Sequence, residues 1–323
     1  MPCRHPLEAV QEIGSGAKPI IYGRGKRPKV VAEGFKALEL PCGQCAGCRL
    51  EYARQFAVRI VHEAAWLEQV RGLYSVFVTL TYNEASLPFG GTLVKHHLQD
   101  FIKRLRARIA PRKVRYYACG EYGSTCPQHE VENCPYCGPV QRPHYHAIIL
   151  GFDFPDRYYV HDRDGEPIYC SELLDSVWPF GFHEIGSCTF ESAGYVARYA
   201  MKKVTGKNAV EHYTRYCPWT NTWFEVTPEF ALMSRRPGLG KDFLECYETD
   251  FYDRDECPIP GRGVFGTPPR YYDKVFGEKY PEYFEEVKQE RQDRMVQSLE
   301  SGPSLESRGK VQDAKINMLR RKL

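Results

Sequence analysis

Residues 142–152 read RPHYHAIILGF, and from His144 onward they have the pattern of a β-strand. Residues two apart in a strand share a face, so Ile148 and Leu150 point the same way as His144 and His146. The two imidazoles then project side by side, close enough to bind one metal ion. Paired histidines at the start of a strand can also be ordinary hydrogen-bonded polar residues, and the motif alone leaves that alternative open.

Strand and helix patterns extend on both sides of this stretch. Alternating β-branched and aromatic residues predict strands, and apolar residues at steps of three and four predict helices. The expected elements are strands at 74–82, 113–122 and 181–190, and helices from Cys48 to Gly72, at 96–110 and at 192–204. Adjacent strands with helices on one side favour an α+β fold, with helices packed on a central antiparallel sheet.

Composition divides the chain into three parts. Residues 1–48 contain cysteines but little periodicity, and we expect loops there with a short strand or two. Residues 49–240 form the expected central domain, with a Cys/His-containing insertion at 124–140. Residues 241–323 begin with an acidic region and end in a charged tail, which we expect to be partly helical or disordered.

Length and hydropathy bound the class of protein. The 323 residues are 42% apolar and 13% aromatic, which is enough for a sizeable core. No apolar run approaches the roughly 20 residues that cross a bilayer. The first residues, MPCRHPLEAV, lack the apolar core of a signal peptide. We therefore expect a cytoplasmic protein that does not associate with a membrane.

Glu121 lies at the end of the strand that precedes the histidines. If strands 113–122 and 144–151 pair antiparallel, the end of the first lies beside the start of the second. Glu121 would then complete a site of two nitrogen ligands and one oxygen ligand. Such a site suits Mg²⁺ or Mn²⁺ and leaves positions open for a phosphate oxygen.

Two tyrosines follow in GYVARYAMKK, residues 194–203. On a helix, Tyr195 and Tyr199 stand one turn apart on one face, and Arg198 and Lys202 each follow a tyrosine by three residues. A phenol has a pKa of about 10 and is a poor nucleophile at neutral pH. A nearby cation and a metal-polarised phosphate would make its attack feasible. Aromatic packing is the alternative for this pair.

Basic residues gather between Lys95 and Lys113, where seven cations accompany the single acid Asp100. The whole chain has a net charge of only +3, so this local concentration is the better indicator of a polyanion-binding surface. An ordinary solvated helix is the alternative. The candidate DNA-binding residues are Lys103, Arg104, Arg106, Arg108 and Arg198.

The chain has thirteen cysteines, and seven of them form two clusters. Cys126, His129, Cys134 and Cys137 have the spacing C-x2-H-x4-C-x2-C, which is typical of structural Zn²⁺. Cys42, Cys45 and Cys48 form a second candidate cluster, for which Cys3 is the expected fourth ligand. Unligated loop thiols, small thiols packing at a helix start, or an iron–sulfur cluster at the second group are the alternatives.

The segments FVTLTY (77–82), RPHYHAIILG (142–151) and YVARYAMKK (195–203), in this order, resemble the HUH endonucleases of rolling-circle replication. Within that superfamily, residues 41–64 and 116–123 are similar to the replication initiators of microviruses, gokushoviruses in particular. The resemblance covers about residues 40–205. It implies an HUH nuclease fold, whose palm is RRM-like.

The resemblance also implies roles for individual residues. His144 and His146 would bind the catalytic metal, with Glu121 as third ligand. Tyr195 and Tyr199 would act alternately as nucleophiles, while Lys202 and Lys203 would position the scissile phosphate. Thr79 and Thr81 would contribute to folding and DNA contact.

The implied reaction is nicking of single-stranded DNA at a replication origin in the cytoplasm of a bacterial host cell. It would yield a 5′-phosphotyrosine and a free 3′-hydroxyl that primes host polymerase, and rejoining would close the displaced circle. The sequence contains no GxxxxGK[ST] motif, so we expect a host helicase as partner. The alternatives are a non-catalytic, zinc-stabilised nucleic-acid-binding protein and a metal-dependent hydrolase that activates water. A relaxase or a single-tyrosine transposase is an alternative within the first class.

Overall fold

The computed structural model divides into two compact units, Met1–Tyr52 with Gly277–Leu323 and Ala53–Phe276, and each is described by itself. The structure describes every residue except 1, 2, 4, 16, 24, 27, 29, 124–141, 200–202, 205, 207, 218, 219, 303–306, 308, 312 and 315–323. For residues 23, 199, 264, 265, 299 and 300 it describes the backbone only.

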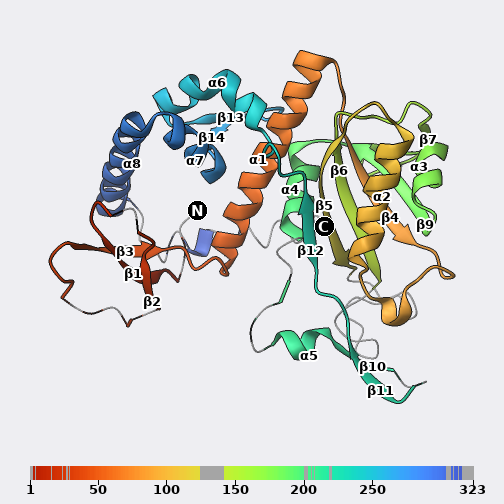
Figure 1. The fold of residues 1–323 in the computed structure, drawn as a ribbon, viewed down its shortest axis with the longest axis horizontal. Coiled ribbons are helices and arrows are strands. Elements are labelled where there is room, and N and C mark those ends of the chain that lie inside the picture. The colour runs from red at the N-terminus through yellow and green to blue at the C-terminus, as the bar shows by residue number, and fades with distance from the viewer. Residues whose placement is uncertain are drawn as a thin grey trace. The chain divides into compact units, whose positions relative to one another are not determined.

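A seven-stranded antiparallel sheet forms the second unit, in the order β12-β5-β6-β4-β9-β8-β7 (Figure 1). Its strands are β4 (Val76–Tyr82), β5 (Arg115–Tyr122), β6 (Pro143–Leu150), β7 (Tyr158–Arg163), β8 (Glu166–Cys170), β9 (Gly181–Ser187) and β12 (Phe230–Met233). The expected α+β class with a central antiparallel sheet is confirmed.

Helices cover both faces of this sheet. They are α1 (Ala46–Arg71), α2 (Lys95–Arg108), α3 (Glu172–Val177) and α4 (Phe190–Tyr199). Ala147 and Ile149 of β6 pack in the same core as the apolar residues of α2 and α3. Ile148 and Leu150, on the opposite face, pack with apolar residues of α1 and α4. The expectation of helices on one side was wrong, because a strand that is apolar at consecutive positions needs cover on both faces.

The register of β5, β6 and β4 places the polar ends of three strands together. Glu121 is directly opposite His144 in the β5–β6 pair, and the predicted antiparallel pairing is thereby confirmed. On the other side of β6, Thr81 is opposite His144 and Thr79 is opposite His146. The chain between β5 and β6, which contains the insertion at 124–140, does not alter this register.

Helix α1 ends where the sequence predicts. Gly72 has a φ of 64°, a conformation that glycine adopts without steric cost. Its N–H donates to the Glu68 carbonyl at 2.9 Å, and the N–H of Leu73 donates to the Leu67 carbonyl at 3.0 Å. The first of these is the bond of an αL helix cap, and both bonds satisfy carbonyls at the helix end.

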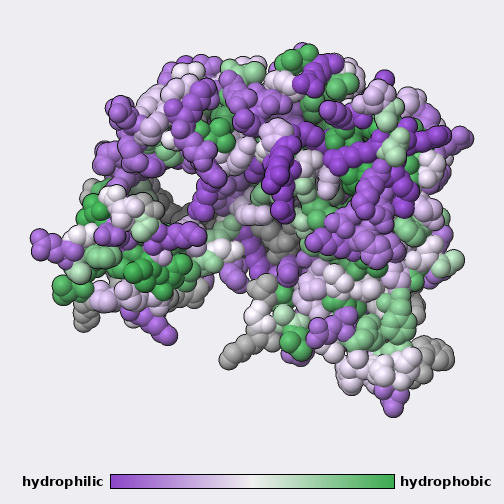
Figure 2. Space-filling model, viewed as in Figure 1, coloured by the Kyte–Doolittle hydropathy of each residue, from purple (hydrophilic) through white to green (hydrophobic). Residues whose placement is uncertain are grey.

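Helix α2 packs one face on the sheet through Leu98, Phe101, Ile102 and Leu105. The other face is hydrophilic, as Figure 2 shows over this helix. That polarity agrees with the basic amphipathic helix expected from the sequence.

The second unit also contains smaller elements. They are η1 (Phe89–Gly91), α5 (Ala209–Tyr213), β10 (Thr214–Cys217), β11 (Thr222–Glu225), α6 (Lys241–Arg254), β13 (Cys257–Ile259), β14 (Val264–Gly266) and α7 (Arg270–Lys279), which ends in the first unit. The expected boundary between residues 240 and 241 falls inside this unit, since α6 belongs to it.

The first unit contains a three-stranded antiparallel sheet in the order β2-β1-β3. Its strands are β1 (Leu7–Glu12), β2 (Ile20–Gly23) and β3 (Phe35–Leu40), and the unit also contains α8 (Pro281–Ser301). The sequence predicted mostly loops before residue 40, since these strands are short and half-exposed. No helix in the described part of the chain has the length and apolar character needed to cross a membrane.

Candidate metal centre and its neighbouring tyrosine

Three predicted ligands meet on one face of the large sheet. Oε1 of Glu121 lies 2.7 Å from Nε2 of His144 and 3.0 Å from Nε2 of His146. The side chains of Glu121 and His146 are 2% and 5% exposed, while that of His144 is 19% exposed. The site is therefore open on the His144 side and closed beneath.

The hydrogen bonds of the other ring nitrogens orient the two imidazoles. Nδ1 of His144 lies 3.2 Å from the Arg142 carbonyl, which can only accept, so Nδ1–H is the donor. Nδ1 of His146 lies 3.1 Å from Oγ1 of Thr79, a hydroxyl that can accept its proton. A neutral ring that donates through Nδ1 keeps its lone pair on Nε2. With a metal bound, both Nε2 lone pairs would face the ion beside Glu121, as in metal-binding histidines. Without one, each Nε2 can carry a proton and donate to the carboxylate.

The donor set fits a divalent cation. Ligand atoms about 2.1 Å from an ion and at right angles to each other lie about 3 Å apart, close to the distances found here. The three ligand atoms lie within 4.8 Å of one another. Burial raises the pKa of Glu121, but hydrogen bonds with the two imidazoles outweigh it and hold the pKa below its usual value. The carboxylate is thus ionised and available as a ligand.

Helix α4 brings Tyr195 to this site. The rings of Tyr195 and His146 are 5.0 Å apart between centroids, with an interplanar angle of 84°. Tyr195 is half-buried beside the core that α1, α4 and the sheet share. Phe77 of β4 lies under both rings, stacked on His146 at 5.4 Å and edge-on to Tyr195 at 6.2 Å. The phenol is thereby placed next to a candidate metal ligand.

The other predicted residues of this helix are described in part. Tyr199 is the last residue of α4, and its side chain lies outside the described structure. Lys202 lies among the residues that are not described, and Lys203 is exposed. Arg198 is half-buried in the last turn of α4.

The basic residues of α2 lie on the face of the sheet opposite to the metal ligands, since α2 packs with Ala147 and Ile149. Arg104 donates to the Val177 carbonyl at 2.9 Å, and Arg106 donates to the Val114 carbonyl at 3.1 Å. Lys103 pairs with Asp100 at 2.9 Å, and Arg108 is exposed. The structure therefore does not bring this helix to the Glu121 site.

Two features of the site were not singled out from the sequence. Thr79 orients His146, whereas the resemblance implied only folding and DNA contact for this residue. Arg163 of β7 forms two hydrogen bonds with Glu184, at 2.6 and 2.7 Å, and Glu184 is opposite Thr79 in the β4–β9 pair. This ion pair adds a cation to the same region of the sheet, and its residues carry no local motif.

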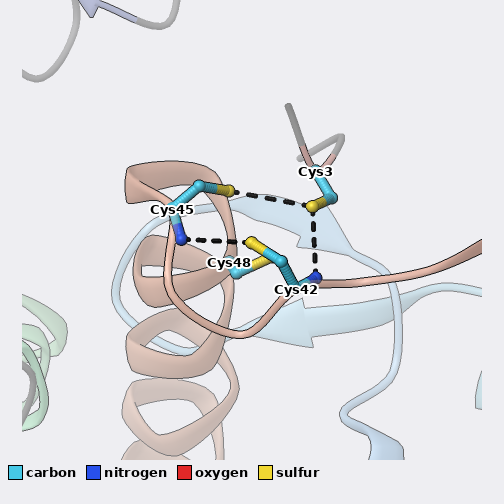
Figure 3. A group of neighbouring side chains, drawn as sticks. All are labelled: Cys3, Cys42, Cys45 and Cys48. Carbon is cyan, nitrogen blue, oxygen red and sulfur yellow. Dashed lines mark hydrogen bonds between the residues drawn. The ribbon is translucent and has the colours of Figure 1, made fainter. Parts of the chain in front are cut away.

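The four cysteines of the second candidate cluster also meet (Figure 3). The Sγ atoms of Cys3 and Cys45 are 3.8 Å apart, and all four lie within 4.8 Å of one another. Burial raises the pKa of Cys42, but hydrogen bonds, first from the backbone of Gln44, outweigh it and bring the value to about 6. Burial raises the pKa of Cys48 to about 12. Four adjacent thiols can ionise together only where a cation balances their charge. The other candidate zinc group, at 126–137, lies outside the described residues.

Comparison with known proteins assigns the family. A family model described as Replication-associated protein ORF2/G2P matches residues 75–204. The chain is 32% identical over 292 residues to replication-associated protein VP4 of Bdellovibrio phage phiMH2K, across 87% of this chain and 79% of the relative. The chain belongs to the replication-associated protein ORF2/G2P family.

Two further relatives carry similar names. Replication-associated protein ORF2 of Spiroplasma virus 4 is 28% identical over 265 residues, across 78% of this chain and 73% of the relative. Replication-associated protein ORF4 of Chlamydia phage 1 is 28% identical over 173 residues, across 51% of this chain and 38% of the relative. No solved structure matches.

The part of the chain that matches the ORF2/G2P family model contains Glu121, His144, His146 and Tyr195. The candidate metal centre and its neighbouring tyrosine therefore lie in the part of the chain that the family model matches. The Cys3 cluster precedes that region. The resemblance to microvirus replication proteins that the motifs indicated is confirmed.

Proposed function

We propose that this ORF2/G2P protein initiates rolling-circle replication by nicking single-stranded DNA at an origin with a tyrosine nucleophile, and later rejoins the ends. The observation that carries the proposal is the edge-on contact of Tyr195 with His146, one of three converging metal ligands. A phenol in that position can reach a phosphate held at the metal centre.

In the proposed nicking step, the phenolic oxygen of Tyr195 attacks the phosphorus of one phosphodiester. The new bond joins Oη to phosphorus, and the bond between phosphorus and the 3′ oxygen breaks. The phenol loses its proton, and the leaving oxygen gains one to become a free 3′-hydroxyl. The 5′-phosphotyrosine retains the energy of the broken ester, so that rejoining requires no ATP.

Side chains of this protein would bind the metal ion, orient its ligands and restrict the position of Tyr195. Glu121, His144 and His146 would hold Mg²⁺ or Mn²⁺, which when bound supplies Lewis-acid polarisation of the scissile phosphate. Thr79 and the Arg142 carbonyl fix the two rings with Nε2 facing the site. Phe77 packs against both His146 and Tyr195, which limits their movement relative to each other.

A second tyrosine would complete the cycle. Tyr199 follows Tyr195 by four residues in α4, which places the two Cα atoms one helical turn apart on one side of the helix. We infer that the two residues alternate, one holding the 5′ end while the other attacks the next junction. Arg198, Lys202 and Lys203 are the proposed cations for the scissile phosphate. On this scheme, each single Tyr→Phe variant still cleaves once.

The DNA backbone would also contact a basic cleft of about 560 Å³ in the second unit. Two carboxylates, of Glu63 and Asp242, also line it. Its cationic lining residues are Arg71, Arg106, Arg112, Lys113, Arg115 and Arg236. Arg115 begins β5 and Glu121 is near its end, so the cleft lies roughly 20 Å along the strand from the metal ligands. Phosphate contacts there would supply affinity that depends on salt and not on sequence.

The remaining parts of the proposal follow from the chemistry and the resemblance. The free 3′-hydroxyl would prime host polymerase, and a host helicase would separate the strands in the cytoplasm of a bacterial cell. We keep the three-part division at residues 48 and 240 as a proposal about function, with the nuclease residues in the central part.

Short single-stranded oligonucleotides spanning a candidate origin test the proposed function. With Mg²⁺ or Mn²⁺ present, a denaturing gel should show a covalent protein–DNA adduct and a free 3′ fragment, and EDTA should prevent both. A non-catalytic DNA-binding protein would shift the oligonucleotide without cutting it. A metal-dependent hydrolase would cut it without an adduct. Either of these last two results would overturn the proposal.

A further inference from the structure

We propose that Cys3, Cys42, Cys45 and Cys48 bind one structural Zn²⁺ ion as a tetrahedral site of four thiolates, which fastens the start of the chain to the first turn of α1. The site is separate from the Glu121 centre and has no part in the nicking chemistry.

The spacing of the sulfur atoms fits a single small ion. Four ligands about 2.3 Å from a tetrahedral zinc ion lie about 3.8 Å from one another. The Sγ atoms of Cys3 and Cys45 are 3.8 Å apart, and no pair among the four exceeds 4.8 Å. In a four-iron cluster each thiolate binds a different iron, which requires sulfur atoms farther apart than these.

The four ligands come from two segments that are distant in the sequence. Cys3 precedes β1, whereas Cys42 and Cys45 lie between β3 and α1, and Cys48 lies in the first turn of α1 (Figure 3). The N–H of Cys42 donates to Sγ of Cys3 at 3.2 Å, and that of Cys45 donates to Sγ of Cys42 at 3.3 Å. Backbone N–H donors favour thiolates over thiols, and thiolates are the zinc ligands.

The alternatives account less well for this arrangement. All four cysteines are half-buried, so they do not serve as packing residues of an apolar core. The Sγ atoms of Cys3 and Cys45, at 3.8 Å, are far beyond the roughly 2.05 Å of a disulfide bond. One disulfide would also leave two thiols facing each other.

The small sheet of the first unit buries few apolar residues, so a bound metal ion would add substantially to its stability. Of the β1–β3 residues, Ala9 and Val10 are the buried apolar ones, while Ile20 and Ile21 are 54% and 56% exposed. A sheet with so little buried apolar area gains much of its stability from a metal. Four thiols lose their protons on binding zinc, and the binding free energy adds to the folding free energy.

The test uses the full-length chain, purified under reducing conditions after expression with added zinc. Zinc per chain is measured by mass spectrometry for the wild type and for the Cys42→Ser, Cys45→Ser double variant. The control is Cys246→Ser, which removes an exposed thiol outside the cluster. We expect the double variant to hold one zinc equivalent fewer than the wild type and the control to hold the same amount. Any zinc bound by residues 126–137 is present in all three proteins, so it does not affect the difference in zinc content between them. Equal zinc content in all three proteins would overturn the proposal.

A second measurement needs no variant and so does not depend on the variant's folding. The wild-type chain is alkylated with iodoacetamide, with and without a zinc chelator, and the modified peptides are quantified. We expect Cys3, Cys42, Cys45 and Cys48 to react several-fold more slowly than Cys246 until the chelator is added. Reaction of the four as fast as Cys246 in the zinc-loaded chain would contradict a thiolate zinc site.

Discussion

The ring of Tyr195 meets the ring of His146 edge-on, with 5.0 Å between their centroids. His146 comes from β6 and Tyr195 from α4, so the contact joins the sheet and the helix that covers it. Phe77 of β4 packs against both rings. The residue proposed to attack and a residue proposed to hold the metal therefore belong to one packed group. A change in one should alter the position of the other.

Thr79 provides a test of how His146 is oriented. Thr79→Val keeps the shape of the side chain but removes the hydroxyl that lies 3.1 Å from Nδ1 of His146. Loss of such a partner typically weakens metal binding roughly 10- to 100-fold. We expect half-maximal nicking to require correspondingly more Mn²⁺, with the maximal rate largely restored at saturation. Thr79→Ser should behave as the wild type. An unchanged Mn²⁺ requirement in Thr79→Val would exclude this role.

Matched variants can distinguish the proposed metal ligands from other histidines. His146→Ala should abolish nicking, because the buried site loses one of three ligands. The circular dichroism spectrum should stay that of the wild type. His161→Ala removes an imidazole from β7 and should leave nicking unchanged. Undiminished nicking by His146→Ala in excess EDTA would end the argument for a metal.

The basic cleft predicts a salt-dependent contribution to DNA binding. The triple variant Arg112→Gln, Lys113→Gln, Arg236→Gln removes three exposed cations from its lining. Binding of a single-stranded oligonucleotide, followed by fluorescence anisotropy at several salt concentrations, should weaken. The slope of log K against log salt should fall by about 0.7 for each phosphate that the variant no longer neutralises.

The matched control for the cleft is Lys18→Gln, Lys26→Gln, Lys36→Gln, which removes the same charge from exposed residues of the first unit. Its affinity and slope should stay near those of the wild type. If both triple variants lose the same affinity, the net charge and not the cleft determines binding.

His62 predicts a loss of stability in acid. It is fully buried, donates from Nε2 to the Pro258 carbonyl at 2.7 Å and accepts at Nδ1 from the Tyr272 hydroxyl at 3.0 Å. Burial lowers the pKa of His62 from 6.5 to about 4. The unfolded chain therefore takes up a proton between these values that the folded chain excludes. The contribution of neutral His62 to the free energy of unfolding is therefore fully present above pH 6.5. It falls by up to about 3 kcal/mol as the pH drops to 4.

Chemical denaturation at pH 7 and pH 4 measures this loss. His62→Gln cannot titrate, so its free energy of unfolding should fall less over the same interval, although the variant is less stable at pH 7. The control His161→Gln should keep the pH dependence of the wild type. If the free energy of unfolding falls equally in His62→Gln and in the wild type, His62 does not cause the loss of stability in acid.

The sequence was sufficient to predict the core of the fold because the relevant strands have strong patterns. The strand pattern of residues 144–150 and the position of Glu121 together predicted the β5–β6 pair and its polar end, and the register confirmed both. The helix before Gly72 was predicted because its apolar stripe and its glycine stop agree.

Other elements lacked such signals. Strand β7 is exposed at most positions, so no alternation marks it. Its hairpin with β8 turns at Asp164 and Gly165, both with positive φ, and an Asp-Gly pair is a known hairpin signal that could have revealed it. The ion pair of Arg163 with Glu184 joins residues 21 apart, and only the sheet order brings them together.

Identification of the residue joined to DNA tests the central claim most directly. The covalent adduct formed on an origin oligonucleotide is digested with nuclease and protease, and the peptide that carries the residual nucleotide is sequenced by mass spectrometry. We predict the nucleotide on Tyr195 or Tyr199 of the α4 peptide, and no adduct in the Tyr195→Phe, Tyr199→Phe double variant. A nucleotide on any other residue, or an adduct that persists in the double variant, would contradict the account.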